Sequence, residues 1–350
     1  MRRTQGGLGM VELMVAVVIG MVGMVALFQL SKMAEGQRRS TISGSDAQSN
    51  GMFAMYALQG DLRQAGYGLN WNVLLDCAAT NAYDATRSPA TLPTFPVAPV
   101  IIDAAANATQ SDTVTILYSS SQQVTSPAAL TSNPASATAS YPLQSRFGYA
   151  LGDLVLLAER RAASVPIVTD CIVAQVSGLP AGNANIEHAD GASYPYNKPD
   201  AFGISFTTNA RVFNLGPSPV RNVYAVVGND LTVRNFLNSA TANVLAPQIV
   251  QMRAQYCKDT DGNTTTDVCN TTTPANATEW RQVLSVRVAV VARSAQPEKP
   301  SGGGACDTTT TAPTWQGGSF NLTAAADWQC YRYQVFETTV PLRNQIWFQQ

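Results

Sequence analysis

The feature that most constrains this chain is an apolar run near its N-terminus. After Arg2 and Arg3, residues 8–28 carry a single charged residue, Glu12. At ~1.5 Å per residue, a helix over this run is about 30 Å long, which matches the hydrocarbon core of a bilayer. Because the arginines precede the run, the positive-inside rule predicts a cytoplasmic N-terminus, with the rest of the chain across the membrane.

Three interpretations of this run compete. A cleaved secretory signal would be shorter and would end at a small-x-small site, whereas Phe28-Gln29-Leu30-Ser31-Lys32-Met33 follows here. A plain single-pass anchor leaves Glu12 unexplained, since a carboxylate at the bilayer centre costs roughly 2.5–3.5 kcal/mol and less near an end. The third interpretation is a prepilin signal, which accounts for the acidic residue.

The segment resembles the N-terminus of type IV pilins and pseudopilins. Those proteins have a short basic leader that ends in Gly, then an apolar residue, and Glu at the fifth mature position. In this chain Gly7 ends such a leader (residues 1–7), Leu8 begins the mature chain, and Glu12 occupies the fifth place. The resemblance implies cleavage between Gly7 and Leu8 by a prepilin peptidase, and N-methylation of Leu8. Leu8 replaces the usual Phe, and Gly9 replaces the commoner Thr or Ser.

The spacing of Glu12 from the new N-terminus has a physical reason. Cleavage gives Leu8 an α-amine with an ordinary pKa of about 8. Glu12 lies one helical turn away at i+4 and also favours the positive end of the helix dipole. We therefore expect the Glu12 carboxylate to pair with its own amine or with that of a neighbouring chain, which would set the register between adjacent helices.

The helical pattern continues beyond the membrane. Residues 31–65 contain no proline, and apolar residues recur at helical spacing. We predict a spine helix over residues 8–66, transmembrane at about 8–30, which ends at Gly66-Tyr67-Gly68. The alternative is an anchor joined to a disordered linker, which the four glycines Gly36, Gly44, Gly51 and Gly60 keep open.

Residues 67–350 are expected to form a β-rich periplasmic domain. The pattern from residue 110 onward predicts strands over 113–119, 154–158, 165–176, 202–206, 211–215, 222–227, 230–235, 249–256, 283–293 and 331–340. Several of them alternate apolar and polar residues, as 286–290 does. A long helix followed by antiparallel strands gives an α+β fold, in which the membrane-spanning helix packs on a β-sheet domain through its second half.

Short phrases along the chain are similar to the PilW group of minor pilins. They are Asp61-Leu62-Arg63-Gln64-Ala65-Gly66-Tyr67-Gly68, Gly152-Asp153-Leu154-Val155-Leu156-Leu157, Asp170-Cys171 and Thr338-Thr339-Val340-Pro341-Leu342-Arg343-Asn344. Because the phrases are spread along the chain, the resemblance extends well beyond the signal.

All six cysteines follow the membrane span, on the side that the topology places in the oxidising periplasm. An even count there predicts three disulfides, although six cysteines allow fifteen connectivities. We favour Cys257–Cys269 and Cys306–Cys330, which leaves Cys77–Cys171. The alternative is that some of them are buried free thiols.

Two polar features are weak candidates for chemistry. Asp259, Asp261 and Asn263 alternate as calcium ligands do, but Gly262 is misplaced and no Glu closes a twelve-residue loop, so a polar turn is favoured. The single histidine, His188, lies in a polar loop and is expected to be solvated.

Composition argues against several classes of protein. With 22 basic and 23 acidic residues, the net charge of −1 does not suit a nucleic-acid binder or a polybasic membrane-surface protein. One histidine cannot build a zinc site that needs two or three, and no nucleophile elbow, phosphate-binding loop or dinucleotide-binding motif is present. We therefore expect neither an enzyme nor a cofactor.

The resemblance to the PilW group implies a structural function. The chain would be a single-pass inner-membrane protein that enters a type IV pilus at or near its tip and primes assembly through helix–helix packing. Its partners would be other minor pilins, the major pilin, prepilin peptidase and membrane lipid, without direct nucleic-acid binding. Adhesion, motility or DNA uptake would follow indirectly. The alternatives are a type II secretion pseudopilin and, from another class, a membrane-anchored periplasmic enzyme.

Overall fold

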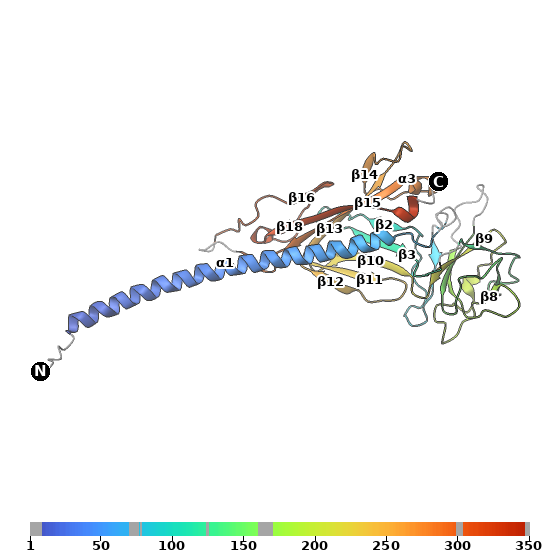
Figure 1. Cartoon of the computed structure of the whole chain (residues 1–350), viewed down its shortest axis with the longest axis horizontal. Coiled ribbons are helices and arrows are strands. Elements are labelled where there is room, and N and C mark those ends of the chain that lie inside the picture. The colour runs from blue at the N-terminus through green and yellow to red at the C-terminus, as the bar shows by residue number, and fades with distance from the viewer. Residues whose placement is uncertain are drawn as a thin grey trace.

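A single long helix runs from the N-terminal end of the molecule into its β domain (Figure 1). The computed structural model describes residues 9–69, 77, 79–123, 126–159, 171–298 and 304–346. The helix, α1, spans Met10–Gln64, and Gly9 is its N-cap residue. It ends where Gly66 adopts a φ of 78°, a conformation that glycine reaches without steric cost. The predicted leader, residues 1–7, and Leu8 lie outside the described residues.

Two sheets lie along the second half of α1. The middle sheet has the strand order β12-β11-β10-β3-β2, and all its recorded pairs are antiparallel. The C-terminal sheet has the order β14-β13-β15-β18 and is also antiparallel. Strand β13 contacts β2, β3, β10 and β11, so the two sheets share one core. Their strands are β2 (Val100–Asp103), β3 (Thr113–Tyr118), β10 (Val220–Val227), β11 (Asp230–Asn235), β12 (Asn243–Pro247), β13 (Ile249–Lys258), β14 (Val268–Asn270), β15 (Val283–Arg293) and β18 (Tyr333–Pro341).

A third unit, the outer sheet, lies at the end of the molecule opposite the N-terminus (Figure 1). Its strand order is β1-β7-β6-β9-β4, and only the β1–β7 pair is parallel among its recorded pairs. The strands are β1 (Thr80–Asn81), β4 (Ala128–Ala129), β6 (Leu154–Glu159), β7 (Cys171–Gln175) and β9 (Ala210–Gly216). Strands β6 and β7 are buried along their whole length, which explains their continuous apolar sequences.

Short elements complete the described chain. Two small two-stranded sheets pair β5 (Tyr141–Pro142) with β8 (Asn185–Ile186), and β16 (Thr314–Trp315) with β17 (Gly318–Ser319). The short helices are η1 (Ala201–Gly203), α3 (Ala277–Gln282), η2 (Trp328–Cys330) and α4 (Arg343–Ile346).

Disulfides join Cys77 to Cys171, Cys257 to Cys269 and Cys306 to Cys330. They are the pairs that the sequence analysis favours, and together they account for all six cysteines. Cys257 and Cys269 face each other as register partners on β13 and β14. The first pair ties the segment after α1 to β7 of the outer sheet.

The predicted α+β class, a long helix packed on a mostly antiparallel β domain, is confirmed. The predicted strand over 202–206 is wrong. Residues 201–203 form η1, capped by Asp200, whose carboxylate accepts a hydrogen bond from the Phe202 N–H. Left-handed backbone at Ala201, Phe202 and Gly203 turns the chain there. Of the predicted strand over 165–176, residues 165–170 lie outside the described residues.

Candidate functional site

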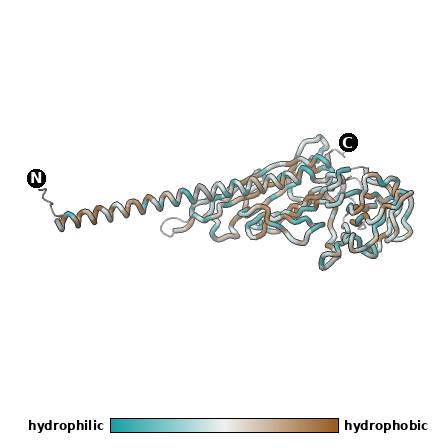
Figure 2. The backbone as a smooth tube through the Cα atoms, turned by 60° about the horizontal axis from the view of Figure 1, so that its bottom comes forward, coloured by the Kyte–Doolittle hydropathy of each residue, from teal (hydrophilic) through white to brown (hydrophobic). Residues whose placement is uncertain are grey.

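The first half of α1 presents apolar side chains to its surroundings on every face. Met10–Glu35 is long and apolar enough to cross a membrane, and the β domain buries none of it. Figure 2 shows this projecting segment as predominantly hydrophobic. Met10 is 85% exposed and Phe28 is 71% exposed. Contiguous apolar surface of this size marks a membrane or protein contact, because water solvates it poorly.

Glu12 lies in the first turn of this exposed segment. Its backbone N–H donates to the Gly9 carbonyl at 3.0 Å, so the helix has begun before the carboxylate. Its side chain is exposed. A carboxylate there interacts favourably with the unpaired N–H groups of the helix start. Gly7 and Leu8, the residues expected to flank the cleavage site, lie outside the described residues.

The second half of α1 is fastened to the two neighbouring sheets. Leu58 and Leu62 are fully buried, one turn apart, in the core shared by the middle and C-terminal sheets. Gly51 allows the closest approach, because a Cβ built on it would lie 2.0 Å from Cε2 of Phe336 on β18. The glycine therefore makes room for a strand side chain, and the alternative of a linker after the anchor does not describe this region.

A carboxylate near the end of α1 forms a second attachment, named here the Asp61 clasp. The hydroxyl of Tyr118 on β3 donates to Asp61 Oδ1 at 2.9 Å. The hydroxyl of Tyr224 and the amide Nδ2 of Asn222, both on β10, donate to Oδ2 at 2.6 Å each. Burial, and then the Asp61 charge, raises the pKa of Tyr118 and Tyr224 well above the ordinary value, so both remain donors.

The end of α1 is held by backbone groups of distant segments. The Gly66 N–H donates to the Leu117 carbonyl at 2.9 Å, and the Ser119 N–H donates to the Tyr67 carbonyl at 2.8 Å. Asn344 Nδ2, in α4, donates to the Gln64 and Ala65 carbonyls at 3.2 and 3.1 Å. These bonds satisfy helix-end carbonyls that have no partner within the helix.

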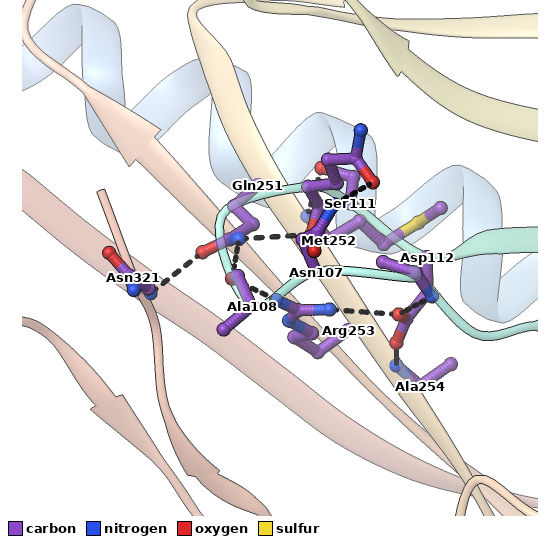
Figure 3. Close-up of polar contacts among 11 residues, drawn as sticks. Asn107, Ala108, Ser111, Asp112, Gln251, Met252, Arg253, Ala254 and Asn321 are labelled. Atoms are coloured by element: carbon purple, nitrogen blue, oxygen red, sulfur yellow. Dashed lines mark hydrogen bonds and ion pairs between the residues drawn. The ribbon is translucent and has the colours of Figure 1, made fainter. Parts of the chain in front are cut away.

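A polar network holds the β2–β3 loop against β13 (Figure 3). Asp112 Oδ1 accepts from Arg253 Nη1 at 2.9 Å, and Oδ2 accepts from the Ala254 N–H at 2.9 Å. The buried Gln251 amide donates to the Ala108 carbonyl at 2.8 Å and accepts from the Asn321 N–H at 3.1 Å. The hydrogen-bonding groups of Asp112 and Gln251 bind neighbouring segments of the chain, which indicates a structural role for the network.

The acidic loop between Cys257 and Cys269 has the contacts of a polar turn. Asp259 accepts from the N–H groups of Gly262 and Thr264, at 2.7 Å each. Asn263 donates its amide to Asp261 at 2.9 Å instead of lying beside it as a fellow ligand. The carboxylate that lies near those of Asp259 and Asp261 is that of Asp267, which is not among the calcium ligands that the sequence suggested.

His188 is buried, so the expectation of a solvated histidine is wrong. It is 6% exposed and stacks on Tyr141 with ring centroids 4.1 Å apart. Its Nε2 lies 2.8 Å from the Ala139 carbonyl oxygen. Burial lowers the pKa of the imidazole. Sequence reasoning missed this packing because Tyr141 is distant along the chain.

Comparison with known proteins gives a family assignment for part of the chain. Residues 227–344 match the family model described as type IV pilus-assembly protein W. No curated protein matches this chain. A solved structure, a type IV-like pilin from Thermus thermophilus, aligns over 86% of this chain and 97% of its own at 12% identity. Its TM-score of 0.30 is too low to establish a shared fold.

The matched region covers the parts of the β domain that contact α1 most closely. It includes β11, β12, the whole C-terminal sheet and the start of α4. Strands β15 and β18 of that sheet pack on α1, and the phrase from Thr338 to Asn344 lies at its end. The predicted resemblance to the PilW group is therefore confirmed over residues 227–344, which match the family model of type IV pilus-assembly protein W.

Proposed function

We propose that this chain is a minor pilin that takes part in type IV pilus assembly. The observation that carries the proposal is the combination of a PilW region with an apolar helix that this region holds by its second half only. The free half can remain in the membrane before assembly and pack with the helices of neighbouring pilins afterwards. Both environments cover the same apolar surface, so transfer between them exposes little of it to water.

The match to a pilus-assembly family favours the pilus over the alternative of a type II secretion pseudopilin. The protein acts as a structural component, and no observation favours a membrane-anchored periplasmic enzyme. The other minor pilins and the major pilin are its partners in this proposal, and a position at or near the tip follows from a priming role. The β domain lies on the periplasmic side of the inner membrane until the helix leaves the membrane and the chain enters the pilus.

Processing and register complete the proposal. Prepilin peptidase cleaves between Gly7 and Leu8 and methylates the Leu8 amine. The Glu12 carboxylate then pairs with an α-amine, which offsets the cost of a charge within the bilayer, a cost that is roughly 2.5–3.5 kcal/mol at the centre and less near an end, where Glu12 lies. An amine of a neighbouring chain as partner would fix the axial register of the two helices.

The proposal is tested by following the protein into filaments. Bacteria that lack this chain should assemble markedly fewer surface pili by electron microscopy, and the full chain should restore them. Antibody labelling should place it at filament ends. Unchanged pilus number together with absence of the chain from sheared filaments would contradict the proposal.

The role of Glu12 is tested by Glu12→Ala, with Asp46→Ala as the matched control. Asp46 is an exposed acidic residue of α1 that lies beyond the membrane span. We expect Glu12→Ala to lower the ratio of filament-bound to membrane-bound protein at least fivefold. If the lost pairing contributes about 1.4 kcal/mol to the free energy of incorporation, the ratio falls tenfold. Asp46→Ala should leave the ratio unchanged. A wild-type ratio for Glu12→Ala would refute the pairing.

A further inference from the structure

A pocket of about 450 Å³ opens between the middle and outer sheets. Its walls come from the loop after β3, the loop before β6 and the turn between β9 and β10. Small-molecule sites typically have volumes of about 300–1,000 Å³ and prefer junctions between structural units. Strand β9, which leads into the turn that lines the pocket, lies in the part of the molecule opposite the N-terminus (Figure 1).

The walls of the pocket are fixed before any ligand arrives. The Ser120 N–H donates to the Leu215 carbonyl at 2.9 Å, which joins the loop after β3 to β9. Gly216, with a φ of 78°, lets the two segments approach so closely that an added Cβ would lie 2.5 Å from the Ser121 nitrogen. Such a preformed site loses little conformational entropy when it binds a ligand.

The polar groups of the pocket are neutral amides and hydroxyls around one carboxylate. Gln122 and Gln123 line it with exposed side chains. The Ser121 hydroxyl accepts from the Gln123 N–H, which leaves its own proton to donate. Asp153 is 5% exposed, and its Oδ2 accepts from the Ala150 N–H at 2.8 Å and from Asn214 Nδ2 at 2.9 Å. Its two recorded bonds both end on Oδ2, so Oδ1 has no partner among the described residues.

The charge and aromatic content narrow the class of ligand. Among the lining residues of the described chain, none is Lys, Arg or His, so the site lacks the cations that phosphate or carboxylate ligands need. Tyr149 contributes an aromatic ring to the wall. The hydroxyl groups of a sugar both donate and accept hydrogen bonds, so they match the amides, hydroxyl and carboxylate that line the pocket. The apolar face of a sugar ring can also pack on an aromatic ring.

We propose that this pocket binds a neutral oligosaccharide, with Gln122, Gln123, Ser121 and Asp153 as hydrogen-bonding groups. This inference goes beyond the assembly role and does not depend on it, because binding is a property of the isolated full chain. Failure to bind sugar would leave incorporation into filaments unaffected.

The test uses the full chain in a polyoxyethylene detergent, which has no sugar headgroup. Saturation-transfer NMR is recorded with cellotriose, mannotriose and triacetylchitotriose as neutral probes, and with trigalacturonate as the anionic probe. We expect saturation transfer to at least one neutral trisaccharide and none to trigalacturonate. Transfer to the anionic probe alone, or to none of the four, would overturn the proposal.

Variants then locate the binding site. Gln122→Ala and Gln123→Ala each change one exposed side chain of the lining, so the fold should survive. Each should raise the Kd of the bound trisaccharide about tenfold. Tyr56→Ala, which removes a 77% exposed ring on α1, should leave the Kd unchanged. A wild-type Kd in both pocket variants would equally overturn the proposal.

Discussion

Replacing Asp61 by alanine is expected to loosen the attachment of α1 to the middle sheet. The substitution removes three hydrogen bonds, from Tyr118, Asn222 and Tyr224. Each is worth about 1 kcal/mol net, and the Tyr224 hydroxyl, on a residue 3% exposed, loses its partner at a further cost of about 1 kcal/mol. The sum is about 4 kcal/mol, reduced to about 3 because Asp61 is only half-buried.

Hydrogen exchange followed by mass spectrometry on the full chain in detergent measures this loss directly. A decrease of about 3 kcal/mol in the free energy of local opening lowers amide protection in the second half of α1 by roughly two orders of magnitude. Tyr224→Phe, which removes one donor, should show a smaller loss. Asp46→Ala, on the same helix but exposed, should show none.

Equal protection in Asp61→Ala and Asp46→Ala would refute the reasoning. It would mean that burial of the apolar face alone holds the helix, and that the Asp61 clasp only orients it. A loss of protection throughout the β domain would likewise contradict a local attachment.

Two further predictions concern packing. Gly51→Ala should be less stable than Gly60→Ala by about 1–3 kcal/mol in urea unfolding, because the new methyl meets Phe336 at the first site and nothing within 4 Å at the second; equal midpoints would contradict this. The pKa of His188 is lowered in the folded state, so folding favours its neutral form. Its contribution to the free energy of unfolding is therefore complete above about pH 6.5 and decreases as the pH drops below that value. The slope should reach at most about 1.4 kcal/mol per pH unit and should be smaller in His188→Gln, whereas an identical slope in the variant would exclude this histidine as the cause.

Local sequence signals predicted much of the fold because their causes are local. The proline-free stretch and the cap at Gly66 predicted the end of α1 to within a few residues. The alternation in 283–293 predicted β15, which has the same limits. In contrast, β12 (Asn243–Pro247) was missed, because it is a short edge strand with polar and proline residues whose place is set by pairing with β11.

The candidate site was predictable only in its N-terminal part. The position of Glu12 follows from spacing within one segment. The Asp61 clasp joins Asp61 to side chains that are between 57 and 163 positions away along the chain, so no pattern in the sequence reveals it. The burial of His188 has the same origin, since its stacking partner Tyr141 lies on β5, far away along the chain.

The central claim is that the exposed N-terminal helix is that of a processed pilin. Its most direct test is the intact mass and the N-terminal residue of the full chain extracted from bacterial membranes, with the disulfides kept oxidised. The account predicts a chain that begins at N-methylated Leu8, with the mass of residues 8–350 plus one methyl group. A chain that still begins at Met1 would contradict it.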